Sequence, residues 1–204
     1  MNLFQQSISR LTQRVASVAR PDLTSRDPEV PDWVVQTGSA DSDVAAPPQS
    51  DAESHAVAQR LLVAASSSMM PLTEADAGRI TAYLEFQEFP AGARIIEEGD
   101  GRNTDFVSLL LAGEVRIETT LNPGLDPQTF DVMGPGTVMG VVGFMDGLPR
   151  WGSHTALSPI VCAILTRSRL KALIEDDPML GAKFLLAMAQ KLAEVQRDQI
   201  ARLK

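Results

Sequence analysis

The chain has 204 residues, 44% of them hydrophobic, which is enough for one folded domain with extensions. Its formal net charge of −8 argues against general binding to DNA or RNA, which requires clustered lysine and arginine. The single cysteine, Cys162, excludes an internal disulfide and a thiolate metal cluster, and two histidines are too few for a histidine-rich metal site. Cys162 lies in an apolar run, so we expect a buried, unreactive thiol.

Residues 1–20 are predicted to form an amphipathic helix, because apolar residues recur there at steps of three and four. The only charged side chains in it are Arg10, Arg14 and Arg20. Such a helix packs on its own domain or on a second subunit, or it binds a protein partner or a membrane surface. The modest apolar stripe favours packing on protein. No apolar run is long enough to span a membrane and no signal-peptide core is present, so we expect a cytoplasmic protein.

Residues 21–54 are predicted to be an acidic linker rich in proline and serine, because no apolar periodicity is sustained there. Its one apolar cluster, Trp33-Val34-Val35, suits either a docking peptide or packing against the neighbouring domain. We expect the folded domain over residues 55–204. A helix is predicted over 54–70, and Thr73 is predicted to cap a second helix that ends near residue 83.

From Glu85 onward, short apolar runs alternate with turn residues, which is typical of a mainly β barrel or jelly roll. The predicted strands are 94–96, 106–111, 114–119, 130–133, 138–142 and 161–165. The predicted turns contain Pro90-Ala91-Gly92, Gly99-Asp100-Gly101, Asn122-Pro123-Gly124 and Gly134-Pro135-Gly136.

Two helices are predicted to end the chain, a short one over 168–175 and a long one over about 179–203. Four apolar residues of the long helix follow a heptad pattern: Leu185, Met188, Leu192 and Val195. A helix of this length spans about 37 Å, which is more than a small barrel can cover. We therefore predict a homodimer with these four residues in its interface, the alternative being that the helix packs on the barrel.

Three motifs, taken in this order and spacing, resemble the cyclic-nucleotide-binding domain family. They are Phe-Pro-Ala-Gly…Glu-Gly-Asp over 89–100, Leu-Ala-Gly-Glu-Val over 111–115, and a glycine-containing segment from Gly140 to Arg150. The family includes the sensor halves of bacterial regulators such as the catabolite activator protein and Fnr. The resemblance covers residues 61–203 and implies a cyclic-nucleotide-binding-like jelly roll with flanking helices and a long C-terminal helix.

The resemblance also implies a phosphate-binding cassette over residues 140–150. Gly140 corresponds to the first glycine of the cassette, and Arg150 to the arginine that pairs with the ligand phosphate. Ser153 is expected to add a hydroxyl to this site. The ligand-binding set implied by the family consists of Gly140, Val141, Val142, Arg150, Trp151, Ser153 and Gln196, the last of these on the long helix that closes over the base.

The cassette departs from the family pattern at Val141, where the family has a glutamate that accepts a hydrogen bond from the ribose. Trp151 also replaces a small residue, and it is expected to fill part of the pocket or to stack on a base. These changes leave three outcomes open: weakened binding of an ordinary cyclic nucleotide, binding of another ligand such as a cyclic dinucleotide, or no ligand.

No nucleophile–base pair or phosphate-loop motif is present, so we expect a non-enzymatic protein without catalytic residues, bound metal or cofactor. The family's transcription regulators carry a DNA-binding domain after the long helix, for which this chain has no room, so we expect no DNA binding. The leading hypothesis is a signalling protein that passes ligand binding to a protein partner. The alternative is a ligand-free, degenerate domain that serves as an interaction or scaffold module, with its pocket closed by Trp151.

Overall fold

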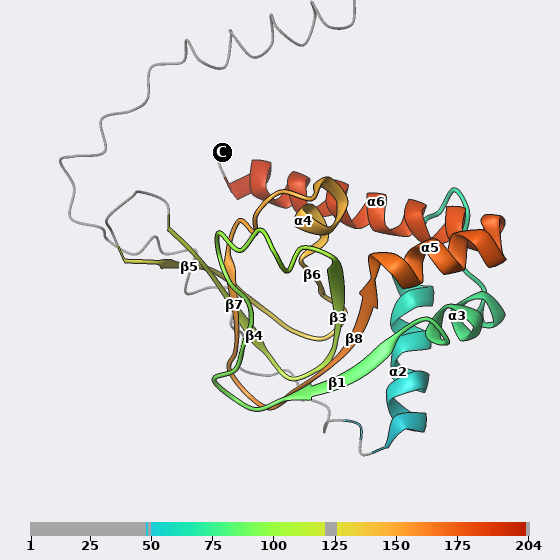
Figure 1. Cartoon of the computed structure of the whole chain (residues 1–204), viewed down its shortest axis with the longest axis horizontal. Coiled ribbons are helices and arrows are strands. Elements are labelled where there is room, and N and C mark those ends of the chain that lie inside the picture. Colours follow the sequence, from blue (N-terminus) through green and yellow to red (C-terminus); the bar gives the residue numbers. More distant parts are fainter. Residues whose placement is uncertain (1–47, 49, 121–125, 203–204) are drawn as a thin grey trace, which may run out of the picture. The chain divides into compact units, whose positions relative to one another are not determined.

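The structure is a computed structural model that describes residues 48, 50–120 and 126–202 (Figure 1). The predicted helix at 1–20, the Trp33 cluster and the predicted turn at 122–124 lie outside the described residues. The helices are α2 (Asp51–Ala64), α3 (Glu74–Thr81), α4 (Val141–Asp146), α5 (Arg167–Asp176) and α6 (Pro178–Arg202). The strands are β1 (Glu85–Phe89), β2 (Arg94–Ile96), β3 (Phe106–Ala112), β4 (Val115–Thr119), β5 (Gln128–Met133), β6 (Val138–Met139), β7 (Ser153–Ala156) and β8 (Ile160–Thr166).

The strands form two antiparallel sheets of four, with the orders β1-β8-β3-β6 and β2-β7-β4-β5. The helices lie beside the first sheet, and α4 contacts both β3 and α6 (Figure 1). The predicted mainly β fold, a jelly roll with flanking helices and a long C-terminal helix, is confirmed. In the described part of the chain, no helix is long and apolar enough to cross a membrane.

The two helices before the barrel show how local hydrogen bonds set helix ends. The Ser50 hydroxyl accepts from the Glu53 amide at 3.3 Å, so α2 begins at Asp51, ahead of the predicted domain start at 55. The predicted end at residue 70 is wrong, because the Ser66 hydroxyl bonds to the Val63 carbonyl at 2.7 Å where α2 stops. The Thr73 cap is confirmed, and the side chain of Asp76 completes a capping box.

Each of the six predicted strands falls at least in part on a strand of the structure, β2, β3, β4, β5, β6 or β8. The predicted strand over 94–96 coincides with β2. The predicted strand over 138–142 is wrong beyond Met139, because Gly140 has φ +78° and α4 begins at Val141. Two strands were not predicted, β1 and β7, because their polar residues interrupt the apolar pattern.

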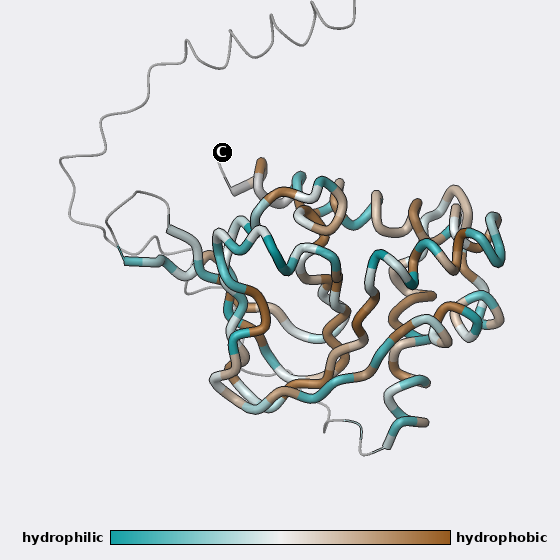
Figure 2. Tube along the Cα trace, in the orientation of Figure 1, coloured by the Kyte–Doolittle hydropathy of each residue, from teal (hydrophilic) through white to brown (hydrophobic). Residues whose placement is uncertain are grey.

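Strands β3 and β8 are buried on both faces and divide the interior into two cores. Their odd-numbered residues, such as Leu109 and Leu165, pack against the helices, whereas even-numbered residues such as Leu110 and Cys162 pack between the two sheets. Hydrophobic and hydrophilic residues both recur along the helices (Figure 2). The predicted burial of Cys162 is confirmed, since it is 0% exposed, and burial raises the pKa of its thiol to about 11.

The apolar stripe of α6 packs largely on its own domain. Met188 is 5% exposed, and Leu185 and Leu192 are partly buried against the same core. Of the four residues predicted for a dimer interface, only Val195 is exposed, at 43%. Met188, Leu185 and Leu192 thus pack on their own domain, and their place in a dimer interface stays a prediction, because the heptad pattern shows that a helix buries one face but not against what. The homodimer itself stays a prediction.

A buried carboxylate joins α3 to α6. Asp76, 7% exposed, accepts from the Lys183 ammonium at 2.7 Å and from Arg79 Nη2 at 3.0 Å. The carboxylate also accepts from the Thr73 amide at 3.1 Å, and the backbone amide of Asp76 donates to the Thr73 hydroxyl at 3.1 Å. These interactions, the Lys183 hydrogen bond first, hold the pKa of Asp76 well below its usual range. We refer to Asp76, Lys183, Arg79 and Thr73 as the Asp76 cluster.

Candidate functional site

Arg150 lies between α4 and β7 and is 4% exposed. Its guanidinium donates four hydrogen bonds, all to backbone carbonyls. Nε and Nη2 donate to the Asn103 carbonyl at 3.1 and 2.7 Å, Nη2 also donates to the Phe106 carbonyl at 2.8 Å, and Nη1 donates to the Gly140 carbonyl at 2.5 Å. Its central carbon lies 4.8 Å from the centroid of the Phe106 ring. One side chain thus connects the start of β3 with the turn that precedes α4.

The loop before β3 is folded so that its carbonyls face Arg150. The Asp100 carboxylate accepts from the amides of Arg102 and Asn103, at 2.8 and 3.3 Å, and from the Asn103 side chain at 2.6 Å. Two backbone bonds link this loop to the arginine segment: the Gly99 amide donates to the Arg150 carbonyl at 2.8 Å, and the Arg150 amide to the Asp100 carbonyl at 3.1 Å. The sequence predicted this turn but not its contacts with Arg150.

Arg150 carries a buried positive charge without a carboxylate in direct contact. Among the residues that the structure describes, no carboxylate oxygen lies within 4.0 Å of its guanidinium. Asp100 and Asp105 favour its charged form from farther away, but burial, and secondarily Arg167, lowers its pKa. Arg167 is itself hydrogen-bonded to the carbonyls of Gly143 and Phe144 at the other end of α4. The Arg150 site is therefore rich in positive charge at its core.

Position 140 requires a glycine because the Arg150 side chain approaches its backbone closely. A Cβ atom at this position would lie 2.5 Å from Arg150 Nη1 and 3.0 Å from the Cδ1 of Ile96, and φ is +78°. Both the space and the backbone conformation exclude a side chain. The structure thus brings together Gly140 and Arg150, the two residues that the motif placed ten positions apart.

The other predicted site residues are distributed unevenly around Arg150. Val141 is 7% exposed and belongs to the core beside the helices, whereas Val142 is exposed. Ser153 is buried and its hydroxyl accepts from the Glu98 amide at 3.0 Å, a bond that does not use the hydroxyl hydrogen. Gln196 is exposed on α6 and has no hydrogen bond to the cassette in the described part of the chain.

A cavity of about 250 Å³ opens beside Arg150. Its lining is mixed in charge and comes from β2, the loop before β3 and the arginine itself: Arg94, Ile95, Ile96, Glu97, Asp100, Asn103, Phe106 and Arg150. Trp151 does not line this cavity. It is 38% exposed and its ring packs edge-on against Phe130, with the centroids 5.3 Å apart.

Sequence reasoning missed His154 on β7, which is 3% exposed. Burial lowers its pKa to about 4; a hydrogen bond with the Gly152 backbone opposes this shift and the positive charge of Arg150 adds to it, so the imidazole is neutral at pH 7. Its ring lies 6.2 Å from that of Trp151, between centroids. A lone histidine in a polar strand carries no sequence signal, although its place four residues after Arg150 could have drawn attention to it.

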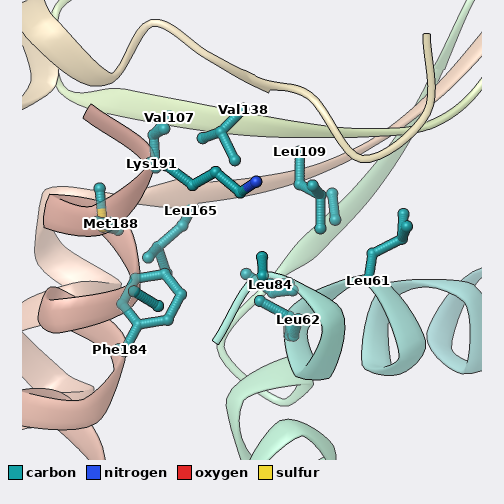
Figure 3. A pocket seen from close by; sticks show the side chains of 13 residues that line it. Leu61, Leu62, Leu84, Val107, Leu109, Val138, Leu165, Phe184, Met188 and Lys191 are labelled. Carbon is teal, nitrogen blue, oxygen red and sulfur yellow. The ribbon is translucent and has the colours of Figure 1, made fainter. Parts of the chain in front are cut away.

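A second, apolar pocket of about 50 Å³ lies between α2, α6 and the first sheet (Figure 3). Leucine, valine and phenylalanine side chains such as Leu62 and Phe184 line it, and Lys191 reaches in from α6. The Lys191 ammonium is paired with the Glu194 carboxylate at 2.8 Å. This pocket shares no lining residue with the cavity beside Arg150, and its one cation, Lys191, is paired, so Arg150 marks the candidate site.

Residues 86–177 match the model of the cyclic nucleotide-binding domain family. These residues run from β1 to the end of α5 and contain every contact of Arg150 described above. The predicted resemblance to the cyclic nucleotide-binding domain family is confirmed over these residues.

Individual relatives agree with this assignment. The chain is 26% identical over 119 residues to the CRP-like cAMP-activated global transcriptional regulator of Mycobacterium tuberculosis, which covers 58% of this chain and 52% of that protein. The chain thus spans about half the length of the curated relatives it matches. A cyclic nucleotide-binding domain from Methylobacillus flagellatus is similar in structure, with a TM-score of 0.68 and 25% identity over 74% of this chain and 82% of that one. The catabolite activator protein of Thermus thermophilus shares the fold, with a TM-score of 0.52 and 24% identity over 64% of this chain and 61% of that one.

Proposed function

We propose that the domain binds a cyclic nucleotide by its phosphate, with Arg150 as the pairing cation, in a non-enzymatic regulatory protein. The observation that carries this proposal is a buried guanidinium with no carboxylate in direct contact. A buried charge is costly unless it is paired, and carbonyl dipoles compensate it only in part. A ligand phosphate supplies the missing negative charge and two oxygens that match the planar fork of arginine.

Phosphate binding requires Arg150 to exchange part of its carbonyl contacts. Nη1 uses only one of its two hydrogens, toward Gly140, so it retains a donor. Ser153 retains its hydroxyl hydrogen as a second donor. Gly140 completes the proposed phosphate side, and Val141 stands at the proposed sugar side. Val142 and Trp151 stay proposed ligand contacts, and Gln196 is proposed to approach only if α6 moves on binding.

The sugar side of the proposed site lacks its usual acceptor, because Val141 is apolar and buried. A ribose hydroxyl placed there without a partner weakens binding by about 1–3 kcal/mol. The mycobacterial relative is a cAMP-activated regulator, which makes cAMP the first ligand to test. A cyclic dinucleotide remains the alternative ligand, since it also binds through phosphates.

The proposed signalling route runs through α4. This helix contacts α6 and β3 and is linked to Arg150 at Gly140, so a phosphate that displaces the Gly140 carbonyl also shifts the start of α4. We propose that α6 transmits the shift to a protein partner or to a second copy in a homodimer. Cytoplasmic location, and a membrane-surface role for residues 1–20, remain proposals to be tested by fractionation and liposome co-sedimentation.

A second candidate function is a ligand-free scaffold module, and one observation favours it. Val141 is part of the apolar core and the guanidinium of Arg150 is bonded to three carbonyls, so the site is internally satisfied except for its charge. In this case Arg150 serves to join the β3 loop to α4, and partners bind elsewhere.

Isothermal titration of the full chain with cAMP, cGMP and cyclic di-GMP distinguishes the two candidates. The matched variant is Arg150→Lys, which keeps the positive charge but loses the fork. We expect heat with at least one ligand and about tenfold weaker binding by the variant. No heat with any ligand, and no nucleotide released on denaturing the purified protein, would support the scaffold module.

A further inference from the structure

The C-terminal end of α4 is held by Arg167, the first residue of α5. Its Nε atom donates to the Phe144 carbonyl at 3.0 Å, and its Nη2 atom donates to the carbonyls of Gly143 and Phe144 at 2.9 Å each. The guanidinium carbon also lies 5.7 Å from the centroid of the Phe144 ring. Since α4 has no basic residue in its own last turn, Arg167 supplies donors that the final carbonyls of a helix lack.

Arginine side chains therefore contact α4 at both of its ends. At the start, Nη1 of Arg150 donates to the Gly140 carbonyl, and at the end Arg167 donates to the last carbonyls of the helix. The helix has six residues and is about 9 Å long, and the Phe144 amide donates to the Gly140 carbonyl at 3.0 Å. Because a helix this short is bonded from one end to the other, a displacement at Gly140 reaches the carbonyls that Arg167 holds.

A backbone bond also joins the start of α5 to the Arg150 site. The Arg167 amide donates to the Asp105 carbonyl at 2.8 Å. Asp105 lies between Asn103 and Phe106, whose carbonyls accept from Arg150. Burial first and Arg167 second lower the pKa of Arg150, so the two positive charges lie close enough to interact. Arg167 thus contacts both segments that Arg150 joins, α4 and the loop before β3.

The helices α5 and α6 form a tightly packed corner. Asp177 alone separates them in the sequence, and its carboxylate accepts from the Leu180 amide at 2.9 Å in the first turn of α6. A Cβ atom at Gly181 would lie 2.7 Å from Cγ1 and 3.0 Å from Cα of Ile174, so α6 approaches the backbone of α5 directly. Helices in such close contact do not slide freely past one another. A movement of the start of α5 is therefore passed to α6.

The far end of α5 is tied to α3 and to the residues that follow α3 (Figure 1). The Tyr83 hydroxyl donates to the Asp176 carboxylate at 2.7 Å, and Arg79 pairs with Asp177. One end of α5 is thus fixed to the helices before the barrel, whereas the other end is bonded to the helix that Arg150 contacts. This arrangement suits a lever whose first turn follows α4.

We propose that Arg167 is a positioning residue that passes ligand binding from α4 to α5 and α6. This inference rests on the proposed function, in which a phosphate displaces the Gly140 carbonyl from Arg150. The start of α4 then moves, and the hydrogen bonds of Arg167 either draw α5 along or break. The direct contact of α4 with α6 is the competing route, since Phe144 and Met188 belong to the same apolar core. Apolar contacts are non-directional, whereas hydrogen bonds fix both distance and angle, so Arg167 carries the larger part of the coupling.

The test follows methionine methyl groups of the full chain by NMR, with and without saturating nucleotide. Met145 reports α4, and Met179 and Met188 report two places along α6. The nucleotides are cAMP, cGMP and cyclic di-GMP, each used where calorimetry shows that the wild type binds it. Saturation removes differences in affinity from the comparison, so the shifts measure how far the response travels.

Three variants are compared with the wild type. Arg167→Gln removes the charge and the fork of donors, and Arg167→Lys keeps the charge without the fork. Arg169→Gln is the matched control, because Arg169 is also an exposed residue of α5 but contacts Glu85, at 3.7 Å, rather than α4. A merely structural role of Arg167 would reduce the responses of α4 and α6 alike, whereas a coupling role reduces only that of α6.

In the wild type and in Arg169→Gln, all three methyl resonances should shift on saturation. In Arg167→Gln we expect the Met145 shift to remain and the two α6 shifts to fall to at most about half, with Arg167→Lys in between. Full α6 shifts in Arg167→Gln, an equal loss in Arg169→Gln, or loss of the Met145 shift in Arg167→Gln overturns this inference and leaves the proposed function standing. Absence of wild-type binding overturns both.

Discussion

Asp76 and Arg150 are both buried and charged, but only Asp76 has side chains of opposite charge as direct partners. Asp76 is 7% exposed and has a lysine and an arginine as direct partners, which stabilise its charged form. Arg150 is 4% exposed and has carbonyl oxygens and an aromatic ring as direct partners, so burial makes its charge less favourable. The charge of Asp76 is paired within the chain, whereas that of Arg150 has no carboxylate within 4.0 Å among the described residues.

The difference indicates which of the two is a structural joint and which is a candidate binding site. The Asp76 cluster holds α3 against α6, and all of its charges belong to the protein. Arg150 also joins segments, but with a surplus of positive charge in a chain whose net charge is −8. Perturbed charges that a structure does not itself balance are concentrated at functional sites. Three substitutions and one addition of ligand test this comparison.

The largest effect is expected from Arg150→Ala. The change leaves the carbonyls of Asn103, Gly140 and Phe106 without their donor and opens a cavity in the core. Each unsatisfied buried group costs about 1–3 kcal/mol, so the free energy of unfolding should fall by about 4 kcal/mol in urea titrations. A loss below about 1 kcal/mol would mean that these hydrogen bonds do not hold the site together.

Gly140→Ala should have the next largest effect. The added Cβ meets Arg150 Nη1 at 2.5 Å, in a backbone conformation with φ +78°, so the arginine or the start of α4 must move. We expect a loss of about 2 kcal/mol in the free energy of unfolding, together with weaker nucleotide binding. Gly134→Ala is the control, because nothing lies within 4 Å of its added Cβ. Equal effects of the two changes would contradict the close approach.

Asp76→Asn tests the buried carboxylate whose charge is paired with Lys183 and Arg79. It removes the ionic part of the contacts to Lys183 and Arg79, and we expect a loss of about 2 kcal/mol at pH 7. The folded-state pKa of Asp76 lies below its unfolded value, so its carboxylate stabilises the protein above pH about 4 and less as the pH falls toward the folded pKa. The difference between wild type and variant, measured in urea at pH 7 and pH 3, should therefore shrink at pH 3. A constant difference would assign the effect to packing.

The features that could be predicted from sequence are those that local residues decide. The Thr73 cap, strand β2 and the closeness of Gly140 to Arg150 follow from capping chemistry, apolar runs and a family motif. The partners of Arg150 could not be predicted, since its acceptors are main-chain carbonyls, which look alike at every position. His154 was missed for a similar reason: its burial depends on which side of β7 faces the barrel, and that is fixed by pairing with strands far away in the chain.

The smallest effect, and the sharpest test of the comparison, is stabilisation by ligand. A nucleotide that binds only the folded protein, added at about ten times its Kd, should raise the free energy of unfolding by about 1.4 kcal/mol. Asp76→Asn should show the same increment from a lower starting value, because Asp76 and Arg150 share no partner. Arg150→Lys, which binds about tenfold more weakly, should gain only about 0.4 kcal/mol at the same concentration. An increment lost in Asp76→Asn but kept in Arg150→Lys would reverse the assignment and make the carboxylate cluster, rather than the buried arginine, the part of the domain that senses the ligand.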